Sequence, residues 1–374
     1  MKTCFQINYQ TSFGGGEVYT RFACAALARL GWRTVLFAHR DAAFWDALDM
    51  HGAELVRIET IAEIDAGLPE RDALVLSHNV LDELTASGWG ARHRLVGILH
   101  MPLFDRDPPG LAHYRRLLAV SQHVLDSAQR RGLRNVHPEP LLGVADLEPR
   151  GPLGPVRRGP LYDWDRKKLR DRLMGTAKRV LGAGRGPEFM RLPGVTLGIV
   201  SRITPIKQFP LLFSILAPIL VDLPGLRLEV FGSGGYASVR DLRRELRPVR
   251  ARVRFWGNQS DVAAVYRQLD YALSGLPEKE ALGLNLIEAQ ACGTPVLAVR
   301  AAPFTETVID GTTGYLYCDP RQDGGKEFRA IAGRILAGAT RPDPRLAPEH
   351  LERFSLAAFS ARLERALATV PAAA

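Results

Sequence analysis

Two glutamates in this sequence have a spacing that suits recognition of a sugar. Glu280 and Glu288 are separated by seven residues, with Gly283 between them. The helical pattern after Gly283 places Glu280 in the loop before a helix and Glu288 more than one turn inside it. A carboxylate can accept two hydrogen bonds from neighbouring hydroxyl groups, such as those of a ribose or another sugar. The alternative is two solvated acidic residues near a helix start, where negative charge is favourable in any protein.

The start of this helix and two basic side chains upstream suit an anionic group. The backbone N–H groups of Gly283 and Leu284 would open the helix and face an anion, as helix N-termini do. Arg202 and Lys207 follow an apolar strand pattern and lie in a proline-containing turn. Two fixed cations at a carboxyl strand end suit a diphosphate, which carries its charge on several oxygens. In an arginine-rich chain, two ordinary surface cations are the alternative.

Three other segments place glycine or histidine at the end of an expected strand. Gly14–Gly16 follows the first apolar segment and would form either a ligand-binding loop or simply a tight turn into a helix. Gly232 lies in a second glycine-rich loop, after an expected strand over 227–231. His100 ends a further apolar segment, where it would either contact a ligand or be a satisfied histidine at a strand end.

The elements that position these residues follow from the pattern of the whole chain. Apolar runs alternate with helix-period stretches, which predicts parallel strands joined by crossover helices. We therefore expect an α/β protein with two open, Rossmann-like parallel sheets facing one another across a cleft, with ligands at the carboxyl ends of the strands. Helices are also expected near 42–51 and over 114–118, and a short strand over 118–121.

The length of 374 residues suits two domains. The expected division is a first domain over 1–150, a basic linker with an inserted helix over 151–193, a second domain over 194–353, and a C-terminal helix over 354–374 that packs back on the first domain.

Composition bounds the partners and the compartment. The formal net charge is +9, which indicates either anionic partners or an arginine-rich proteome. The basic segment 166–179 would be either a helix resting on an anionic membrane or a solvated helix. Since the basic segments do not interleave aromatic residues, no nucleic-acid partner is expected. Four scattered cysteines, the lack of a signal-peptide pattern and the lack of a spanning apolar segment favour a cytoplasmic protein, with peripheral contact at the inner membrane face as an option.

The motifs together resemble the large retaining GT-B glycosyltransferase family called GT4. The likeness covers about 195–317, with every block in order. The blocks are GIVSRITPIK at 198–207, FGSG at 231–234, VRFWGNQSDVAAVYRQLDYALS at 253–274, the Glu280–Glu288 segment and PFTETVIDGTTGYLY at 303–317. The first half agrees more loosely, through GGGE at 14–17, ILHMP at 98–102, AVSQHV at 119–124 and LLGVAD at 141–146.

The resemblance implies transfer of a sugar from a nucleotide diphosphate sugar to a glycan, lipid-linked or small-molecule acceptor, with retention at the anomeric carbon. Arg202 and Lys207 would neutralise the diphosphate, Glu288 would hold the ribose hydroxyls and Glu280 would orient the sugar. The leaving diphosphate would take the acceptor proton, so that no metal and no cofactor is needed. The resemblance also implies that the domain over 1–150 binds the acceptor and that the domain over 194–353 binds the nucleotide sugar. The implied catalytic residues are Glu280, His100, Arg202 and Lys207. The implied donor-binding residues are Gly15, Gly16, Arg202, Lys207, Gly232, Gly257, Asn258, Glu280, Gly283, Leu284 and Glu288.

The chain departs from the family pattern at three places. The common Glu-Gly-Phe-Gly is Glu280-Ala281-Leu282-Gly283 here, so the aromatic residue is lost. The usual Lys-Gly pair is Lys207-Gln208. The connection over 138–193 is long and basic, and it does not align with the family.

Other functions stay as alternatives. A sugar-nucleotide epimerase or a glycan phosphorylase could share the architecture, and a non-catalytic nucleotide-binding protein would explain the charge. An NAD-dependent enzyme lacks support because no GxGxxG follows the first strand. The DxD triplets at 105–107 and 163–165 are interpreted as solvated loops, because neither follows a convincing strand.

Overall fold

The computed structural model describes residues 2–106, 108–145, 154–163 and 186–372, which form two compact units. Unit 1 comprises Met1–Asp146 and Glu352–Ala374, and unit 2 comprises Leu147–Leu351. The basic helix predicted around 166–179 lies outside the described residues. Part of each DxD triplet, namely 107 and 164–165, also lies outside them. None of the helices in the described ranges is long and apolar enough to cross a membrane.

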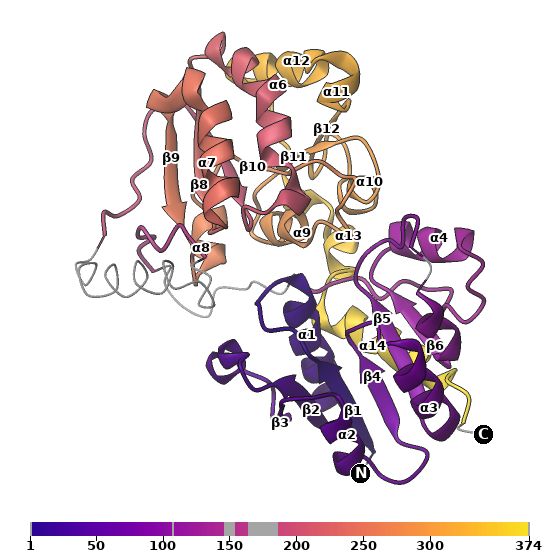
Figure 1. The fold of residues 1–374 in the computed structure, drawn as a ribbon. Coiled ribbons are helices and arrows are strands. Elements are labelled where there is room, and N and C mark those ends of the chain that lie inside the picture. The colour runs from indigo at the N-terminus through magenta and orange to yellow at the C-terminus, as the bar shows by residue number, and fades with distance from the viewer. Residues whose placement is uncertain (1, 107, 146–153, 164–185, 373–374) are drawn as a thin grey trace. The chain divides into compact units, whose positions relative to one another are not determined.

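Unit 1 is built on a six-stranded parallel sheet with the order β3-β2-β1-β4-β5-β6 (Figure 1). Its strands are β1 (Thr3–Asn8), β2 (Arg33–His39), β3 (Glu54–Ile58), β4 (Leu74–Ser77), β5 (Arg94–Leu99) and β6 (Arg116–Ala119). Its helices are α1 (Gly15–Arg29), α2 (Ala62–Gly67), α3 (Glu83–Arg92), α4 (Gln122–Arg130) and α14 (Leu356–Ala368), with short 3-10 turns η1 (Ala43–Ala47) and η2 (Pro109–His113). The central strands are apolar and buried on both faces, as is usual for parallel sheets.

The C-terminal helix α14 belongs to unit 1 although it follows all of unit 2 in the chain. It packs against α1, where the ring of Phe359 contacts Tyr19 and Phe22 edge-on at centroid distances of 6.2 and 6.1 Å. Phe359 is fully buried by this contact.

Unit 2 repeats the same topology in a second sheet, ordered β12-β11-β10-β7-β8-β9. Its strands are β7 (Val195–Val200), β8 (Leu226–Phe231), β9 (Val253–Gly257), β10 (Tyr271–Leu273), β11 (Val296–Val299) and β12 (Gly314–Tyr317). Its helices are α6 (Phe209–Val221), α7 (Tyr236–Glu245), α8 (Val262–Tyr266), α9 (Leu284–Ala291), α10 (Phe304–Thr307), α11 (Pro320–Asp323), α12 (Lys326–Leu336) and α13 (Pro348–Glu352), with 3-10 turns η3 (Pro205–Lys207), η4 (Arg247–Arg252) and η5 (Pro344–Leu346).

Both sheets have the strand order of a Rossmann fold. The first strand of each unit is central, three successive strands extend to one side of the sheet, and the chain then returns to the centre and continues to the other side. The reversal lies between β1 and β4 in unit 1 and between β7 and β10 in unit 2. Ligands in such sheets bind at the carboxyl ends of the strands at this point. The predicted α/β architecture with two parallel sheets is confirmed.

Two predicted elements are wrong. The helix predicted over 114–118 is instead the start of β6, which pairs with β5 and buries Leu117 and Leu118 in the sheet. The strand predicted over 118–121 therefore begins earlier. The helix predicted near 42–51 is only the single 3-10 turn η1. Short apolar runs do not distinguish helix from strand by their pattern, so pairing in the sheet decided the first case.

The described parts of the predicted linker lie against unit 2. Val156 and Phe189 are buried in its core, and Tyr162 pairs with Gly234 through an isolated bridge. Arg157 also pairs with Glu188, joining the two described pieces to one another.

Candidate functional site

Lys207 and Glu280, predicted to share a site, form an ion pair in unit 2. Lys207 ends η3, the turn that follows β7, and its ammonium group contacts Oε2 of Glu280. The backbone holds the two segments together, because the N–H of Leu276 donates to the carbonyl of Lys207 at 3.3 Å. Gly275 allows this approach, since a Cβ there would lie 2.3 Å from the same carbonyl oxygen. Lys207 and Glu280 are thus fixed where β7 and β10 end.

The loop that carries Glu280 is held from two further sides. The side-chain amide of Gln208 donates to Oε2 of Glu278 at 3.1 Å, and Nη1 of Arg321 lies 2.7 Å from the same oxygen. Arg321 comes from α11 and is itself paired with Asp319 at 2.6 Å. Gln208 has a left-handed backbone with φ of 53°, which explains why glycine would suit this position. Sequence reasoning missed Glu278 and Arg321 as contributors to the site.

The helix α9 begins as predicted, directly after Gly283. Gly283 has φ of 79°, and a Cβ there would lie 3.1 Å from the ring of Phe304. A larger residue would therefore strain the backbone and crowd the aromatic ring. Leu284 is the first helical residue, so the helix start that was predicted to face an anion has the expected geometry.

Glu288 lies in the second turn of α9 and is partly buried. The hydroxyl of Tyr266 donates to Oε2 of Glu288 at 3.0 Å. Burial raises the pKa of Glu288 to about 7, although the Tyr266 hydrogen bond and the charge of Lys207 both act to lower that pKa. Glu288 and Lys207 are therefore electrostatically coupled, and Glu288 titrates near neutral pH. Tyr266 is a site residue that sequence reasoning missed, although it lies inside one of the family-like blocks.

The remaining predicted donor residues of unit 2 lie at the carboxyl ends of β7, β8 and β9. Arg202 is exposed in the loop after β7. A Cβ at Gly232, where φ is 136°, would lie 1.9 Å from the carbonyl oxygen of Ser201, so Gly232 is required by the packing of two loops. Its N–H donates to the carbonyl of Gly257 at 2.7 Å.

Gly257 and Asn258 have structural partners in the described linker segment. A Cβ at Gly257 would lie 2.3 Å from the carbonyl of Gly159, and the N–H of Asn258 donates to the carbonyl of Pro160 at 2.8 Å. Backbone packing therefore accounts for the glycine at 257, and the backbone N–H of Asn258 is already used.

His100 lies in unit 1, directly after β5, in contact with a second histidine. Its Nε2 lies 3.2 Å from Nδ1 of His78, which follows β4. Nε2 of His78 lies 2.9 Å from Oε1 of Gln6 in β1. Burial lowers the pKa of both imidazoles, that of His100 to about 4. Sequence reasoning missed Gln6 and His78. The ending of two successive strands in histidine, LVLSH and LVGILH, was the signal available.

The glycine-rich turn of unit 1 lies beside His100. Gly15 and Gly16 begin α1, and a Cβ at Gly16 would lie 3.9 Å from Cδ2 of His100. A Cβ at Gly15 would meet nothing within 4 Å. Neither position needs glycine for packing, because a Cβ at Gly16 would make only an ordinary van der Waals contact and a Cβ at Gly15 would lie in open space.

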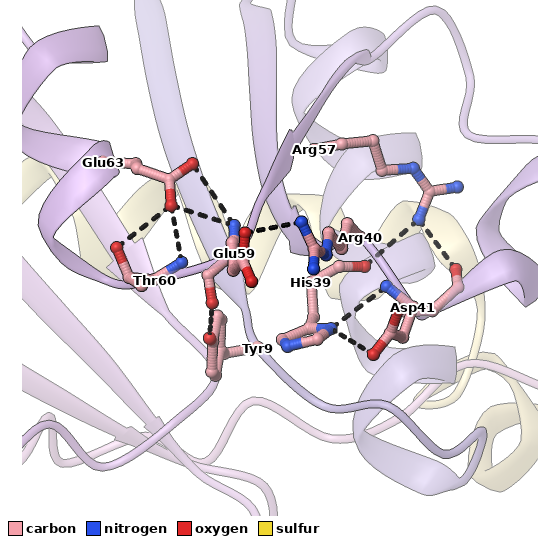
Figure 2. A network of polar contacts seen from close by, with 9 residues as sticks. Tyr9, His39, Arg40, Asp41, Arg57, Glu59, Thr60 and Glu63 are labelled. Carbon is pink, nitrogen blue, oxygen red and sulfur yellow. Dashed lines mark hydrogen bonds and ion pairs between the residues drawn. The ribbon is translucent and has the colours of Figure 1, made fainter.

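A polar network covers the carboxyl ends of β2 and β3 (Figure 2). Tyr9 donates to the backbone carbonyl of Glu59 and packs edge-on against His39 at 4.7 Å. Arg40 pairs with the Glu59 carboxylate, and Glu63 accepts a hydrogen bond from the N–H of Thr60 at 2.8 Å. These groups pair with one another, so the network holds the two loops in place.

Comparison with known proteins supports a carbohydrate-related function. Residues 194–336 match the family described as "Glycosyl transferases group 1". A D-inositol 3-phosphate glycosyltransferase of Actinosynnema mirum is 31% identical over 255 residues, which cover 64% of this chain and 57% of that protein. An N-acetyl-alpha-D-glucosaminyl L-malate synthase of Bacillus anthracis is 31% identical over 132 residues, which cover 35% of this chain and 34% of that protein. This chain thus spans between a third and just over half of the length of these relatives.

Solved structures show the same fold over the whole chain. Anabaena Alr3699/HepE in complex with UDP has a TM-score of 0.71 at 19% identity, covering 99% of this chain and 100% of that one. A sucrose-phosphate synthase from Thermosynechococcus elongatus has a TM-score of 0.68 at 19% identity, covering 98% of each chain. The predicted GT-B fold class is confirmed.

Proposed function

We propose that this chain is a group 1 glycosyltransferase of the GT4 type. It would transfer a sugar from a nucleotide diphosphate sugar to a hydroxyl group of an acceptor, with retention at the anomeric carbon and without a metal ion. The observation that carries the proposal is the ion pair between Lys207, which follows β7, and Glu280, which follows β10, together with the electrostatic effect of Lys207 on Glu288. A cation, a sugar-orienting carboxylate and a diol-accepting carboxylate are the groups that a nucleotide sugar requires.

The proposed step exchanges one bond for another at the anomeric carbon. The bond from this carbon to the diphosphate oxygen breaks, the bond to the acceptor oxygen forms, and the acceptor proton passes to the leaving diphosphate. Negative charge grows on the diphosphate as the bond breaks. Lys207, Arg202 and the start of α9 would stabilise that charge, which is the role of a metal ion in other transferases. Glu280 would orient the sugar through its hydroxyl groups.

We further propose UDP as the nucleotide and a small, negatively charged hydroxyl compound as the acceptor. The UDP complex of the structural neighbour supports the first part. The names of two relatives, which specify D-inositol 3-phosphate and L-malate, support the second. The described cysteines are all free, and two of them, Cys4 and Cys24, are buried, so the proposal places the enzyme in a reducing cytoplasm.

The proposal is tested by thermal unfolding of the full chain with UDP, GDP, ADP and their glucose conjugates. A ligand that binds only the folded state raises the melting temperature by mass action. We expect a rise with UDP and UDP-glucose, and a smaller rise for Lys207→Met, with Lys326→Met as a surface control. No rise with any nucleotide would refute the proposal. Anomeric NMR of the product then distinguishes retention from inversion, and a product without acceptor would indicate an epimerase.

A further inference from the structure

A chain of polar contacts runs across three neighbouring strands of unit 1. Gln6 lies in β1, His78 follows β4 and His100 follows β5, and these strands are adjacent in the sheet. The contacts are 2.9 Å from Gln6 Oε1 to His78 Nε2 and 3.2 Å from His78 Nδ1 to His100 Nε2. On its far side, Nε2 of Gln6 donates to Sγ of Cys24 at 3.2 Å. Gln6 and His78 are buried, so water does not compete with these contacts.

These contacts determine which nitrogen of each imidazole carries the proton. The amide nitrogen of Gln6 faces Cys24, so a carbonyl oxygen faces His78. A carbonyl oxygen can only accept a hydrogen bond, which requires a proton on Nε2 of His78. A neutral imidazole then has a lone pair on Nδ1, and this lone pair accepts from the Nε2–H of His100. Burial keeps both rings neutral, since it lowers both pKa values well below 7.

The second nitrogen of His100 remains available. Among the described residues, Nδ1 of His100 has no hydrogen-bond partner. The ring packs edge-on against Tyr19 at 5.4 Å, and a Cβ placed on Gly16 would lie 3.9 Å from its Cδ2 atom. His100 is partly exposed, whereas His78 behind it is buried. The Nδ1 lone pair of this partly exposed ring therefore lies at the carboxyl end of β5, where ligands of such sheets bind.

We propose that Gln6 and His78 are positioning residues that hold His100 in the Nε2-protonated tautomer, so that its Nδ1 accepts a hydrogen bond from a substrate hydroxyl group. The proposal rests on the proposed transferase function. The hydroxyl belongs either to the donor sugar or to the acceptor. In either case His100 orients the hydroxyl oxygen and does not donate a proton to it. Loss of one such buried hydrogen bond corresponds to about a five- to tenfold change in rate.

Nitrogen-15 NMR of histidine-labelled full-length chain at pH 7 tests the tautomer without any ligand. We expect His100 and His78 to be protonated at Nε2 and unprotonated at Nδ1. Protonation of His100 at Nδ1 would mean that the amide of Gln6 has the opposite orientation, and it would overturn the proposal. A charged His100 at pH 7 would overturn it as well.

Substitutions test the positioning role. His78→Phe retains a planar ring but removes both nitrogens, so His100 should become a mixture of tautomers and kcat should fall about five- to tenfold. Gln6→Glu retains an oxygen acceptor and should keep the tautomer, whereas Gln6→Met should lose it. If His78→Phe does not fold, the two Gln6 variants decide the question. An unchanged His100 tautomer in Gln6→Met would refute the proposal.

The transferase function and the His100 tautomer are tested by different measurements. UDP binding measured by thermal shift reports on the proposed function and should be unaffected by Gln6→Met. If His100 has the expected tautomer but no acceptor receives a sugar, the proposed transferase function is refuted and the tautomer assignment stands. Donors that lack one sugar hydroxyl identify the source of the hydroxyl. If one of them is transferred equally slowly by wild type and by Gln6→Met, the hydroxyl belongs to the donor.

Discussion

Glu288→Gln should make the protein more stable above pH 7 while it weakens donor binding. Burial raises the pKa of Glu288 from 4.5 to about 7. A raised carboxyl pKa means that the folded state favours the neutral form. The associated stability is fully present below pH 4.5, and it is lost as pH rises from 4.5 through about 7. At about 1.36 kcal/mol for each pH unit, ionised Glu288 costs up to roughly 3 kcal/mol at pH 8.

Glutamine has nearly the same shape and carries no charge, so it removes this cost. Partial exposure of Glu288 reduces the cost, and we expect a gain of about 1–3 kcal/mol at pH 8 and none at pH 4. For a domain of this size, about 1 kcal/mol corresponds to a rise of roughly 2–4 °C in melting temperature. The same substitution should weaken UDP binding by about 1–3 kcal/mol, because an amide oxygen accepts hydrogen bonds from a ribose diol less strongly than a carboxylate does.

Melting curves from pH 4 to pH 9 and calorimetric titration with UDP measure the two effects. Glu349→Gln, at an exposed position of the same unit, is the matched control and should change neither. Tyr266→Phe removes the hydrogen bond that lowers the pKa of Glu288, so its UDP affinity at pH 7 should fall and recover towards pH 9. A Glu288→Gln protein that is less stable than wild type at pH 8 would refute the assigned environment.

Three further predictions concern the diphosphate site. Arg202→Ala and Lys207→Ala should each lower kcat by about 10²-fold, with a double mutant well short of additive, as a double-mutant cycle would show. The melting curve should stay unchanged for the exposed Arg202→Ala, whereas Lys207→Ala should lower the melting temperature because it leaves the mostly buried Glu280 carboxylate without its ion-pair partner. EDTA should leave transfer largely intact, whereas its abolition with rescue by Mn²⁺ would contradict the proposed charge scheme. Gln208→Gly relieves the strain of a side-chain-bearing residue in the left-handed backbone region, and it also removes the hydrogen bond to Glu278. These opposing effects are each about 1 kcal/mol, so the free energy of unfolding measured in urea should change little. Gln208→Ala keeps the strain and loses the bond, and should be destabilised by about 1 kcal/mol.

Much of the architecture could be predicted from local sequence pattern. The alternation of apolar and helical stretches predicts both parallel sheets, and Gly283 predicts the start of α9 within one residue. The placement of Lys207 and Glu280 at a carboxyl strand end also follows, because parallel strands bring their ends to one edge. These features depend on short-range periodicity and on turn residues, which the sequence states directly.

Only the tertiary structure decided which groups act on these residues. Gln6, His78 and His100 are separated by 72 and 22 positions, and no local pattern links them. Tyr266 and Glu288 meet only when α8 and α9 pack together. The helix α14 joins unit 1 although all of unit 2 precedes it in the chain. Local sequence pattern thus predicts most of the helices and strands and the residue types at strand ends. Burial and hydrogen-bond partners, which set the pKa and the tautomer, arise only when distant segments pack together.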